Sequence, residues 1–188
     1  SVLNSAPTAI ELSSVSFNEA TGVAIPIGTL ITTDPDNASG FKYSIAQAQG
    51  TDYSKFVVDS DTGQLYFLEQ PDYETKSSYT VRILSEDPGG KVFSESFEII
   101  VADSNEAPVL SLPVGGAVSE DASVVVVEGT LSGSDPEGGE LSYSISDVAV
   151  DSGVYTASGT YGVLDLIEAT GAYTYTMNNH RLAVNSRV

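Results

Sequence analysis

The fold of this chain is decided by residues 79–108, which read YTVRILSEDPGGKVFSESFEIIVADSNEAP. In residues 79–83 and 97–101, apolar side chains partly alternate with polar ones, as they do in a strand that buries one face. Between these two runs lies Asp87-Pro88-Gly89-Gly90, a typical turn sequence. The stretch therefore predicts β-strands separated by a turn and followed by an acidic segment that ends in proline.

Similar strand-like runs, rich in Val, Ile, Tyr, Phe and Thr, recur along the chain. They lie at residues 41–45, 55–58, 64–68, 79–84 and 94–101, and turn clusters at 34–37, 61–63 and 87–90 separate them. No window has the period of a helix. A density of about seven strands per hundred residues is typical of a β-sandwich, so the sequence predicts an all-β protein made of Greek-key sandwiches.

The sequence also repeats itself at a shift of about 101 positions, as from Asn4 to Asn105. Glu19, Asp34, the pair Ala6-Pro7 and the triplet Gly28-Thr29-Leu30 recur as Glu120, Asp135, Ala107-Pro108 and Gly129-Thr130-Leu131. A repeat of this length predicts two tandem modules, at 1–105 and 106–188. The acidic, proline-ended residues 102–108 form the linker, and the proline favours an extended path.

The composition is acidic but contains enough apolar residues for a core. There are 26 Asp+Glu against 7 Lys+Arg, a formal charge of -19, and 41% of the residues are hydrophobic. Such a charge disfavours nucleic acid and anionic lipid as partners, and bound divalent cations would relieve its self-repulsion. Because the chain has no cysteine, disulfides and thiolate metal sites are excluded.

The sequence gives little support for an enzyme or a membrane protein. A Ser-His-Asp triad needs a histidine base, and the single histidine, His180, lies in the C-terminal tail. The acids group at turns rather than as a catalytic pair. The longest apolar run noted, Val124 to Val127, is too short to span a bilayer. We therefore predict a soluble, non-catalytic fragment of a longer protein, without membrane insertion.

Module one resembles a cadherin-type repeat. The resemblance rests on five short motifs in the family's order, although tyrosine replaces the arginine of the third and the linker motif lacks one position. They are Asn18-Glu19-Ala20, Asp34-Pro35-Asp36, Asp72-Tyr73-Glu74, Asp87 and Asp103-Ser104-Asn105-Glu106-Ala107-Pro108. The resemblance implies a cadherin- or immunoglobulin-like sandwich and calcium binding.

Module two is more similar to the VCBS or bacterial cadherin-like repeats of large secreted, RTX-type surface adhesins. The resembling segments are 118–121, 133–139, 159–164 and 171–176. This resemblance implies an extracellular location at a bacterial cell surface. It also implies sandwich domains that calcium stiffens.

The resemblance together with the clustered oxygen donors predicts two groups of Ca²⁺ ligands. Calcium takes six to eight oxygens from carboxylates, carbonyls and amides, which a fold can gather at one pole of a sandwich. The junction group is Glu19, Asp72, Glu74, Asp103, Ser104, Asn105, Asp135 and Glu137. The N-terminal group is Asn4, Asp34, Asp36 and Asp87, and Glu120 and Asp121 are weaker candidates. The alternative is that these residues form solvated turns, in which Asp side chains accept backbone hydrogen bonds.

Module two is also predicted to be short. From Gly63 to Asp103 there are 40 residues, whereas only 17 follow the equivalent Gly171. We expect this module to stop before its last two strands, which would leave strand edges unpaired. His180, Arg181 and Arg187 give its tail an abrupt positive charge.

Two functions agree with these features. The first is a segment of an extracellular bacterial adhesin in which Ca²⁺ stiffens the linker. Its partners would be neighbouring repeats of the same chain, a cell-surface glycan or protein, or a second copy. The alternative is a calcium-dependent carbohydrate-binding module, in which Tyr53, Tyr155, Tyr161 or Tyr173 stacks on sugars, although such tyrosines are more often cross-strand packing partners.

Overall fold

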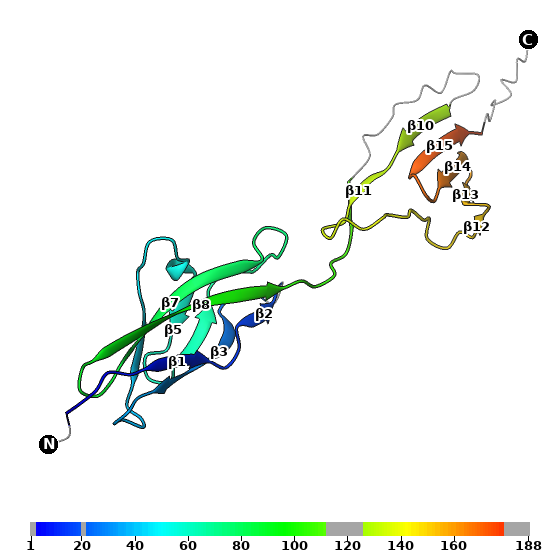
Figure 1. Ribbon diagram of the computed structural model, residues 1–188. Helices are drawn as coiled ribbons and strands as arrows, with labels where there is room; N and C mark the ends of the chain where they lie inside the picture. The colour runs from blue at the N-terminus through cyan, green and yellow to red at the C-terminus, as the bar shows by residue number, and fades with distance from the viewer. Residues whose placement is uncertain (1–2, 20–21, 112–125, 179–188) are drawn as a thin grey trace, which may run out of the picture. The chain divides into compact units, whose positions relative to one another are not determined.

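The computed structural model describes residues 3–19, 22–111 and 126–178 (Figure 1). The chain divides into two compact units, Ser1–Asn105 and Glu106–Val188, and each is described here by itself. We call them unit 1 and unit 2. Both are built from β-strands, so the predicted all-β fold class is confirmed.

The described residues of unit 1 form a sandwich of two four-stranded sheets. One sheet has the order β1-β3-β6-β5 and the other β2-β8-β7-β4. The strands of the first sheet are β1 (Ala9–Leu12), β3 (Ile25–Thr33), β6 (Gln64–Phe67) and β5 (Phe56–Val58). Those of the second are β2 (Ser16–Asn18), β8 (Val92–Ala102), β7 (Ser78–Glu86) and β4 (Lys42–Ile45). One turn of 3-10 helix, η1 (Tyr53–Lys55), precedes β5 and was not predicted from the sequence.

The core of unit 1 lies between these sheets and follows from the alternation of apolar residues. Along β7, residues Tyr79, Val81 and Ile83 are buried while their neighbours are less so. Leu65 and Phe67 of β6 face them from the opposite sheet and are fully buried. The ring of Phe67 lies 4.7 Å from that of Tyr79. Burial of this apolar surface is the main favourable contribution to folding.

Unit 2 contains a five-stranded sheet and a two-stranded ribbon among its described residues. The sheet order is β10-β15-β14-β13-β12, and the ribbon pairs β11 with β9. The bounds are β9 (Val109–Ser111), β10 (Val126–Thr130), β11 (Ser132–Ser134), β12 (Val150–Asp151), β13 (Val154–Ser158), β14 (Gly162–Ile167) and β15 (Ala172–Met177).

The sequence repeat is visible as the same glycine turn in both units. In unit 1, Gly63 has φ +72° and its carbonyl accepts a 2.9 Å hydrogen bond from the Leu30 amide. In unit 2, Gly171 has φ +68° and accepts a 2.8 Å bond from the Leu131 amide. A tyrosine ring, Tyr43 in unit 1 and its counterpart in unit 2, lies against each glycine. Only glycine adopts this backbone conformation without strain.

The two units differ in how far the described residues enclose a core. In unit 2, β14 and β15 pair as β5 and β6 do in unit 1. Within residues 106–111 and 126–178, Leu166 is the buried hydrophobic residue, and no counterpart of the β7–β8 pair follows β15. Because residues 179–188, including His180, Arg181 and Arg187, lie outside the described part, the shortening of module two stays a prediction.

Replacing Gly63 with alanine is expected to destabilise unit 1 by more than the about 1–2 kcal/mol that a left-handed non-glycine residue costs. A Cβ at this position would lie 2.9 Å from Cε2 of Tyr43 and 3.1 Å from the Leu30 carbonyl oxygen, both of them held in the core. Urea unfolding in excess chelator measures the loss, with hydrogen exchange of residues 64–67 assigning the transition to unit 1.

The matched control is Gly50→Ala. Gly50 also has a positive φ, +81°, but nothing lies within 4 Å of its would-be Cβ. The Gly50→Ala variant should lose only the free energy that a left-handed backbone costs a non-glycine residue. If both variants lost the same free energy of unfolding, the clash with Tyr43 would contribute nothing to the destabilisation.

Candidate metal centre

Three carboxylates gather at one end of unit 1, which we call the acidic pole. Oxygens of Glu19, Glu74 and Asp103 all lie within 4.8 Å of one another. Glu19 is buried, whereas the other two are exposed. These residues are far apart in the sequence, so the fold brings them together.

Strand pairing explains why Glu19 and Asp103 are neighbours. β2 pairs in parallel with β8, and Asn18 lies opposite Ala102. Both strands therefore end at the same end of the sheet. The Glu19 amide continues this pairing by donating a 3.2 Å hydrogen bond to the Ala102 carbonyl. Parallel pairing therefore places the residues that follow the two strands side by side.

The buried Glu19 side chain ties three segments together. It is 2% exposed. One carboxylate oxygen accepts a 2.7 Å hydrogen bond from the Tyr73 amide, and the other accepts a 2.6 Å bond from the Ser104 amide. Short hydrogen bonds to an ionised group are the stronger class. The carboxylate thus joins the end of β2, the turn before β7 and the segment after β8.

Asp72 is used differently from the other predicted acids of this pole. Its side chain accepts hydrogen bonds from the Thr75 hydroxyl, at 2.8 Å, and from the Thr75 amide, at 2.9 Å. These two bonds lower the pKa of Asp72 below its ordinary value. Asp72 is not one of the three clustered carboxylates, and its observed contacts shape the turn that presents Glu74.

The donor set of the acidic pole suits calcium. Calcium binds hard oxygen ligands at 2.3–2.6 Å, so two ligands on opposite sides of an ion are about 5 Å apart. The 4.8 Å limit on the carboxylate oxygens falls within this span. Three carboxylates at such separations repel one another unless a cation lies between them.

The predicted ligands of the N-terminal group are also close to one another in unit 1. The Asn4 amide donates to an Asp87 carboxylate oxygen at 3.0 Å, and the Ser5 amide donates to Asp36 at 2.9 Å. One oxygen of Asp34 accepts from the Asp36 amide at 2.9 Å, while the other, Oδ2, is buried without a hydrogen-bond partner. An unpaired buried carboxylate oxygen is costly in the absence of a ligand.

The structure adds Asn37 to this second group. Its side-chain amide donates to Oδ1 of Asn4 and to Oδ1 of Asp34, each at 3.2 Å. The sequence marks Asn37 only as part of the 34–37 turn cluster. Asparagine is common in turns for local reasons, so its spacing gave no signal of a link to Asn4.

Asp87 is held as a carboxylate in this group. Burial raises its pKa, but hydrogen bonds from the Lys91 amide and the Asn4 side chain outweigh that effect, and the pKa lies below its ordinary value. The side chain therefore stays charged near neutral pH and is available as an oxygen ligand.

In unit 2, the predicted ligands lie in a turn and beside the start of the unit. Asp135 accepts a 3.0 Å hydrogen bond from the Gly139 amide, and Glu137 accepts a 2.9 Å bond from the Glu106 amide. Their role as calcium ligands stays a prediction. Glu120 and Asp121 lie outside the described residues.

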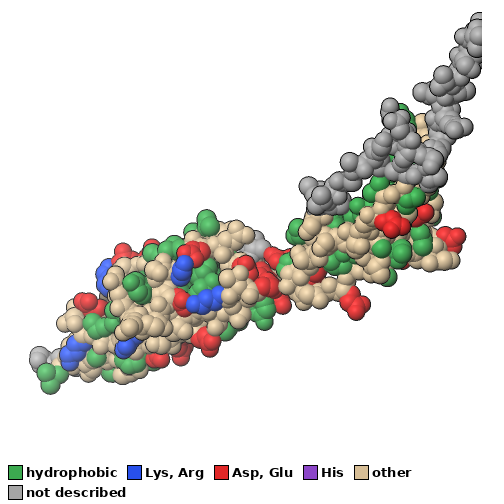
Figure 2. Space-filling view, turned by 90° about the horizontal axis from the view of Figure 1, so that it is seen from above, with side chains coloured by type: hydrophobic (Ala, Val, Ile, Leu, Met, Phe, Trp, Pro, Cys, Tyr) green, Lys and Arg blue, Asp and Glu red, His purple; other side chains and the backbone are tan. Residues whose placement is uncertain are grey.

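Charge is distributed unequally between the two units. Figure 2 shows Lys and Arg side chains only on unit 1, and the described residues of unit 2 include no Lys, Arg or His. Asp and Glu side chains occur on both units. Unit 2 thus has no described basic side chain with which to neutralise its carboxylates.

The tyrosines of the carbohydrate hypothesis have different surroundings. Tyr53, in η1, is 39% exposed and Tyr161 is 76% exposed. Tyr155 and Tyr173 are half-buried and both lie opposite Leu166 in the sheet of unit 2. The last two are therefore cross-strand packing partners, and sugar binding stays a prediction.

Comparison with protein families identifies the first unit. Residues 13–102 match the family model described as "Cadherin domain". This stretch is therefore a cadherin-like repeat, as its acidic motifs predicted. The described part of the chain contains no helix long and apolar enough to cross a membrane.

Two similar proteins are animal cadherins. The chain is 33% identical over 158 residues to mouse "Cadherin EGF LAG seven-pass G-type receptor 1", a match that covers 80% of this chain and 5% of that protein. It is 31% identical over 132 residues to human "Protocadherin gamma-A5", covering 64% of this chain and 14% of that protein. The chain thus spans a small fraction of the length of these relatives.

Solved structures show the same fold. Human protocadherin-24 EC1-2 has a TM-score of 0.59 at 24% identity, covering 92% of this chain and 78% of that one. Mouse cadherin-23 EC22-24 has a TM-score of 0.51 at 22% identity, covering 90% and 53%. None of the proteins named here is bacterial, so the predicted VCBS and RTX-type context has no support from them.

Proposed function

We propose that this cadherin-like chain is a calcium-binding segment of an extracellular adhesion protein. In this proposal Glu19, Glu74 and Asp103 hold Ca²⁺ at the acidic pole, and the ion restrains the segment that leads from unit 1 to unit 2. The observation that carries the proposal is the convergence of three carboxylates from distant segments, with oxygens within 4.8 Å of one another.

The role of the ion follows from where its ligands lie. Asp103 comes directly after β8, at the start of the segment that leaves the sandwich, whereas Glu19 and Glu74 belong to the body of unit 1. An ion bound to all three would neutralise their repulsion and fasten residues 103–105 to the sandwich. A restrained linker transmits force and orientation that a flexible one does not.

We propose the remaining predicted ligands as parts of the same system. Asp72, Ser104 and Asn105 would be further ligands in unit 1, and Asp135 and Glu137 would be ligands in unit 2. Asn4, Asp34, Asp36 and Asp87 would form a second site, which the buried and unpaired Oδ2 of Asp34 supports.

Adhesion and an extracellular location are proposed from the relatives, which are cadherins and protocadherins. The partners would be neighbouring repeats or a second copy of the chain. The finer prediction of a bacterial surface adhesin rests on the resemblance of module two alone.

Calcium is expected to raise the free energy of unfolding of unit 1. A ligand that binds only the folded state contributes about 2.7 kcal/mol at 100 times its dissociation constant. Differential scanning calorimetry in excess chelator and in millimolar CaCl₂ measures the change, and isothermal titration calorimetry gives the affinity. Identical melting curves under the two conditions would contradict the proposal.

Two exposed aspartates provide the matched variants for this measurement. Asp103→Asn removes a proposed ligand, so its calcium affinity should fall strongly. Asp61→Asn makes the same change of charge at a residue that pairs with Lys42 outside the acidic pole, so its affinity should stay close to that of the wild type. Equal titrations of the two variants would show that Asp103 is not a ligand.

A further inference from the structure

The turn that carries Glu74 has little regular structure to hold it in place. It lies between β6 and β7, and the Lys76 amide closes it with a 2.9 Å hydrogen bond to the Asp72 carbonyl. Glu19 holds the turn near its middle through the Tyr73 amide. An acidic turn of this kind needs a further tether, because its own carboxylates repel one another and the neighbouring acids.

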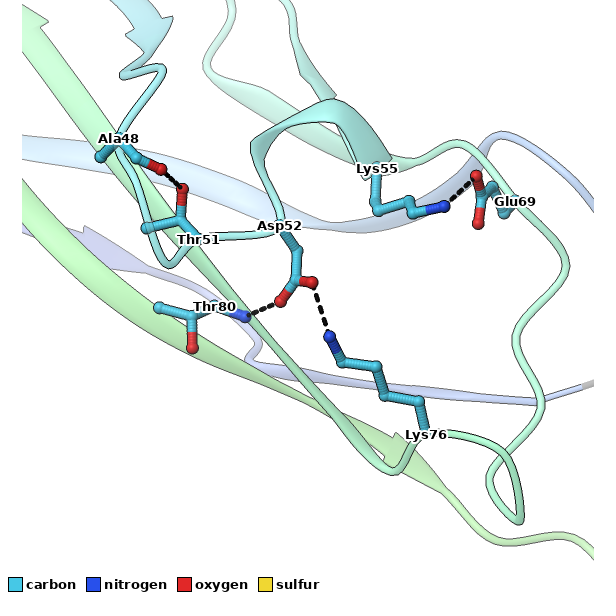
Figure 3. A network of polar contacts seen from close by, with 7 residues as sticks. All are labelled: Ala48, Thr51, Asp52, Lys55, Glu69, Lys76 and Thr80. Carbon is cyan, nitrogen blue, oxygen red and sulfur yellow. Dashed lines mark hydrogen bonds and ion pairs between the residues drawn. The ribbon is translucent and has the colours of Figure 1, made fainter.

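Lys76 provides a tether at the end of the turn. Its ammonium nitrogen lies 2.5 Å from Oδ1 of Asp52. Figure 3 marks this ion pair with a dashed line. The other oxygen of Asp52 accepts a 2.8 Å hydrogen bond from the Thr80 amide, and the Asp52 amide donates to the Thr80 carbonyl at 2.7 Å. Asp52 is thus fixed to β7 from both its side chain and its backbone.

The Lys76 ammonium group is also placed over the core. It lies 4.7 Å from the centre of the Tyr79 ring. That ring is 8% exposed and packs 4.7 Å from the fully buried Phe67 ring. A cation over an aromatic face is attracted by the ring quadrupole, so the lysine has two fixed partners on one side.

We propose that Lys76 and Asp52 are positioning residues for the acidic pole. They fasten the end of the turn to β7, and this fixes the place of Glu74 relative to Glu19 and Asp103. The inference rests on the proposed calcium site and adds the residues that set its affinity. Lys76 and Asp52 do not bind the ion; they determine where one of its ligands lies.

The sign of the effect distinguishes positioning from simple electrostatics. Removing a positive charge near a cation site strengthens cation binding if only Coulomb interactions act. Removing a positioning residue weakens binding, because the ligand must then be ordered by the ion itself. Loss of a residue that orients a metal ligand typically costs 10- to 100-fold in affinity.

The test is calcium titration of the full chain by isothermal calorimetry, followed for the binding step that Glu74→Gln weakens. Lys76→Met keeps the aliphatic stem and removes the ammonium group, and we expect about 10-fold weaker binding. Lys76→Arg, which can still pair with Asp52, should restore most of the affinity. Melting in excess chelator should change little, because a partly exposed ion pair contributes little to stability.

The neighbouring pair Lys55–Glu69 supplies matched controls. Its nitrogen and oxygen are also 2.5 Å apart, and it lies in the same network without joining the turn to β7 (Figure 3). Lys55→Met removes the same charge as Lys76→Met, and its affinity should be unchanged or slightly higher. If Lys76→Met folds poorly, Asp52→Asn compared with Glu69→Gln makes the same comparison on the acidic partners.

The outcomes separate the two proposals. A wild-type chain that does not bind calcium overturns the proposed function, and the inference with it. A wild type that binds, together with Lys76→Met binding as tightly or more tightly, overturns the inference alone. Equal weakening in Lys76→Met and Lys55→Met also overturns it, because the effect would then not depend on the turn.

Discussion

Replacing Glu19 with alanine is expected to lower the free energy of unfolding of unit 1 by about 3 kcal/mol, even when no calcium is present. The substitution removes two charge-assisted hydrogen bonds, to the Tyr73 and Ser104 amides, and each such bond typically contributes about 1.5–3 kcal/mol. We use the low end of this range because the turn that contains the Tyr73 amide is exposed to water. Urea unfolding in excess chelator gives the value.

Calcium binding should be lost in the same variant, since a carboxylate of the acidic pole is removed. The control is Glu74→Gln, which also removes one carboxylate of the trio but from an exposed position. It should weaken calcium binding and leave the stability in chelator nearly unchanged. If both variants had the same stability in chelator, Glu19 would not be the tie between the three segments.

Replacing Phe67 with alanine is expected to cost unit 1 about 3–5 kcal/mol, the range for truncating a large buried aromatic residue. Phe67 is fully buried, and its ring centre lies 5.1 Å from that of Phe17, 5.3 Å from that of Phe56 and 4.7 Å from that of Tyr79. The ring therefore connects both sheets. Thermal and urea unfolding of the variant measure the loss.

Tyr66→Ala is the control for this substitution. Tyr66 precedes Phe67 on β6, so its side chain points to the other face of the sheet, where it is only half-buried. Its truncation should cost clearly less. A similar loss for both residues would mean that the two faces of β6 contribute equally, contrary to the placement of the core.

The acidic pole shows how much of the candidate site could be predicted from the sequence. Glu19, Glu74 and Asp103 were predicted as a group from short motifs in a recognisable order, and the structure brings them together. The same motifs also proposed Asp72, whose side chain accepts two hydrogen bonds from Thr75 and whose role as a ligand stays a prediction. Motifs identify the donor atoms, but local hydrogen bonds decide which way each donor faces.

The sequence by itself determined the all-β fold, the repeat and the identity of the clustered acids. Alternation along β7 and the glycine turns at Gly63 and Gly171 are local properties of the chain, so they can be read without the structure. Only the tertiary structure decided the contacts of Asn37 with Asn4 and of Lys76 with Asp52. These contacts join residues 33 and 24 positions apart, whose side chains meet only after the sheets have formed.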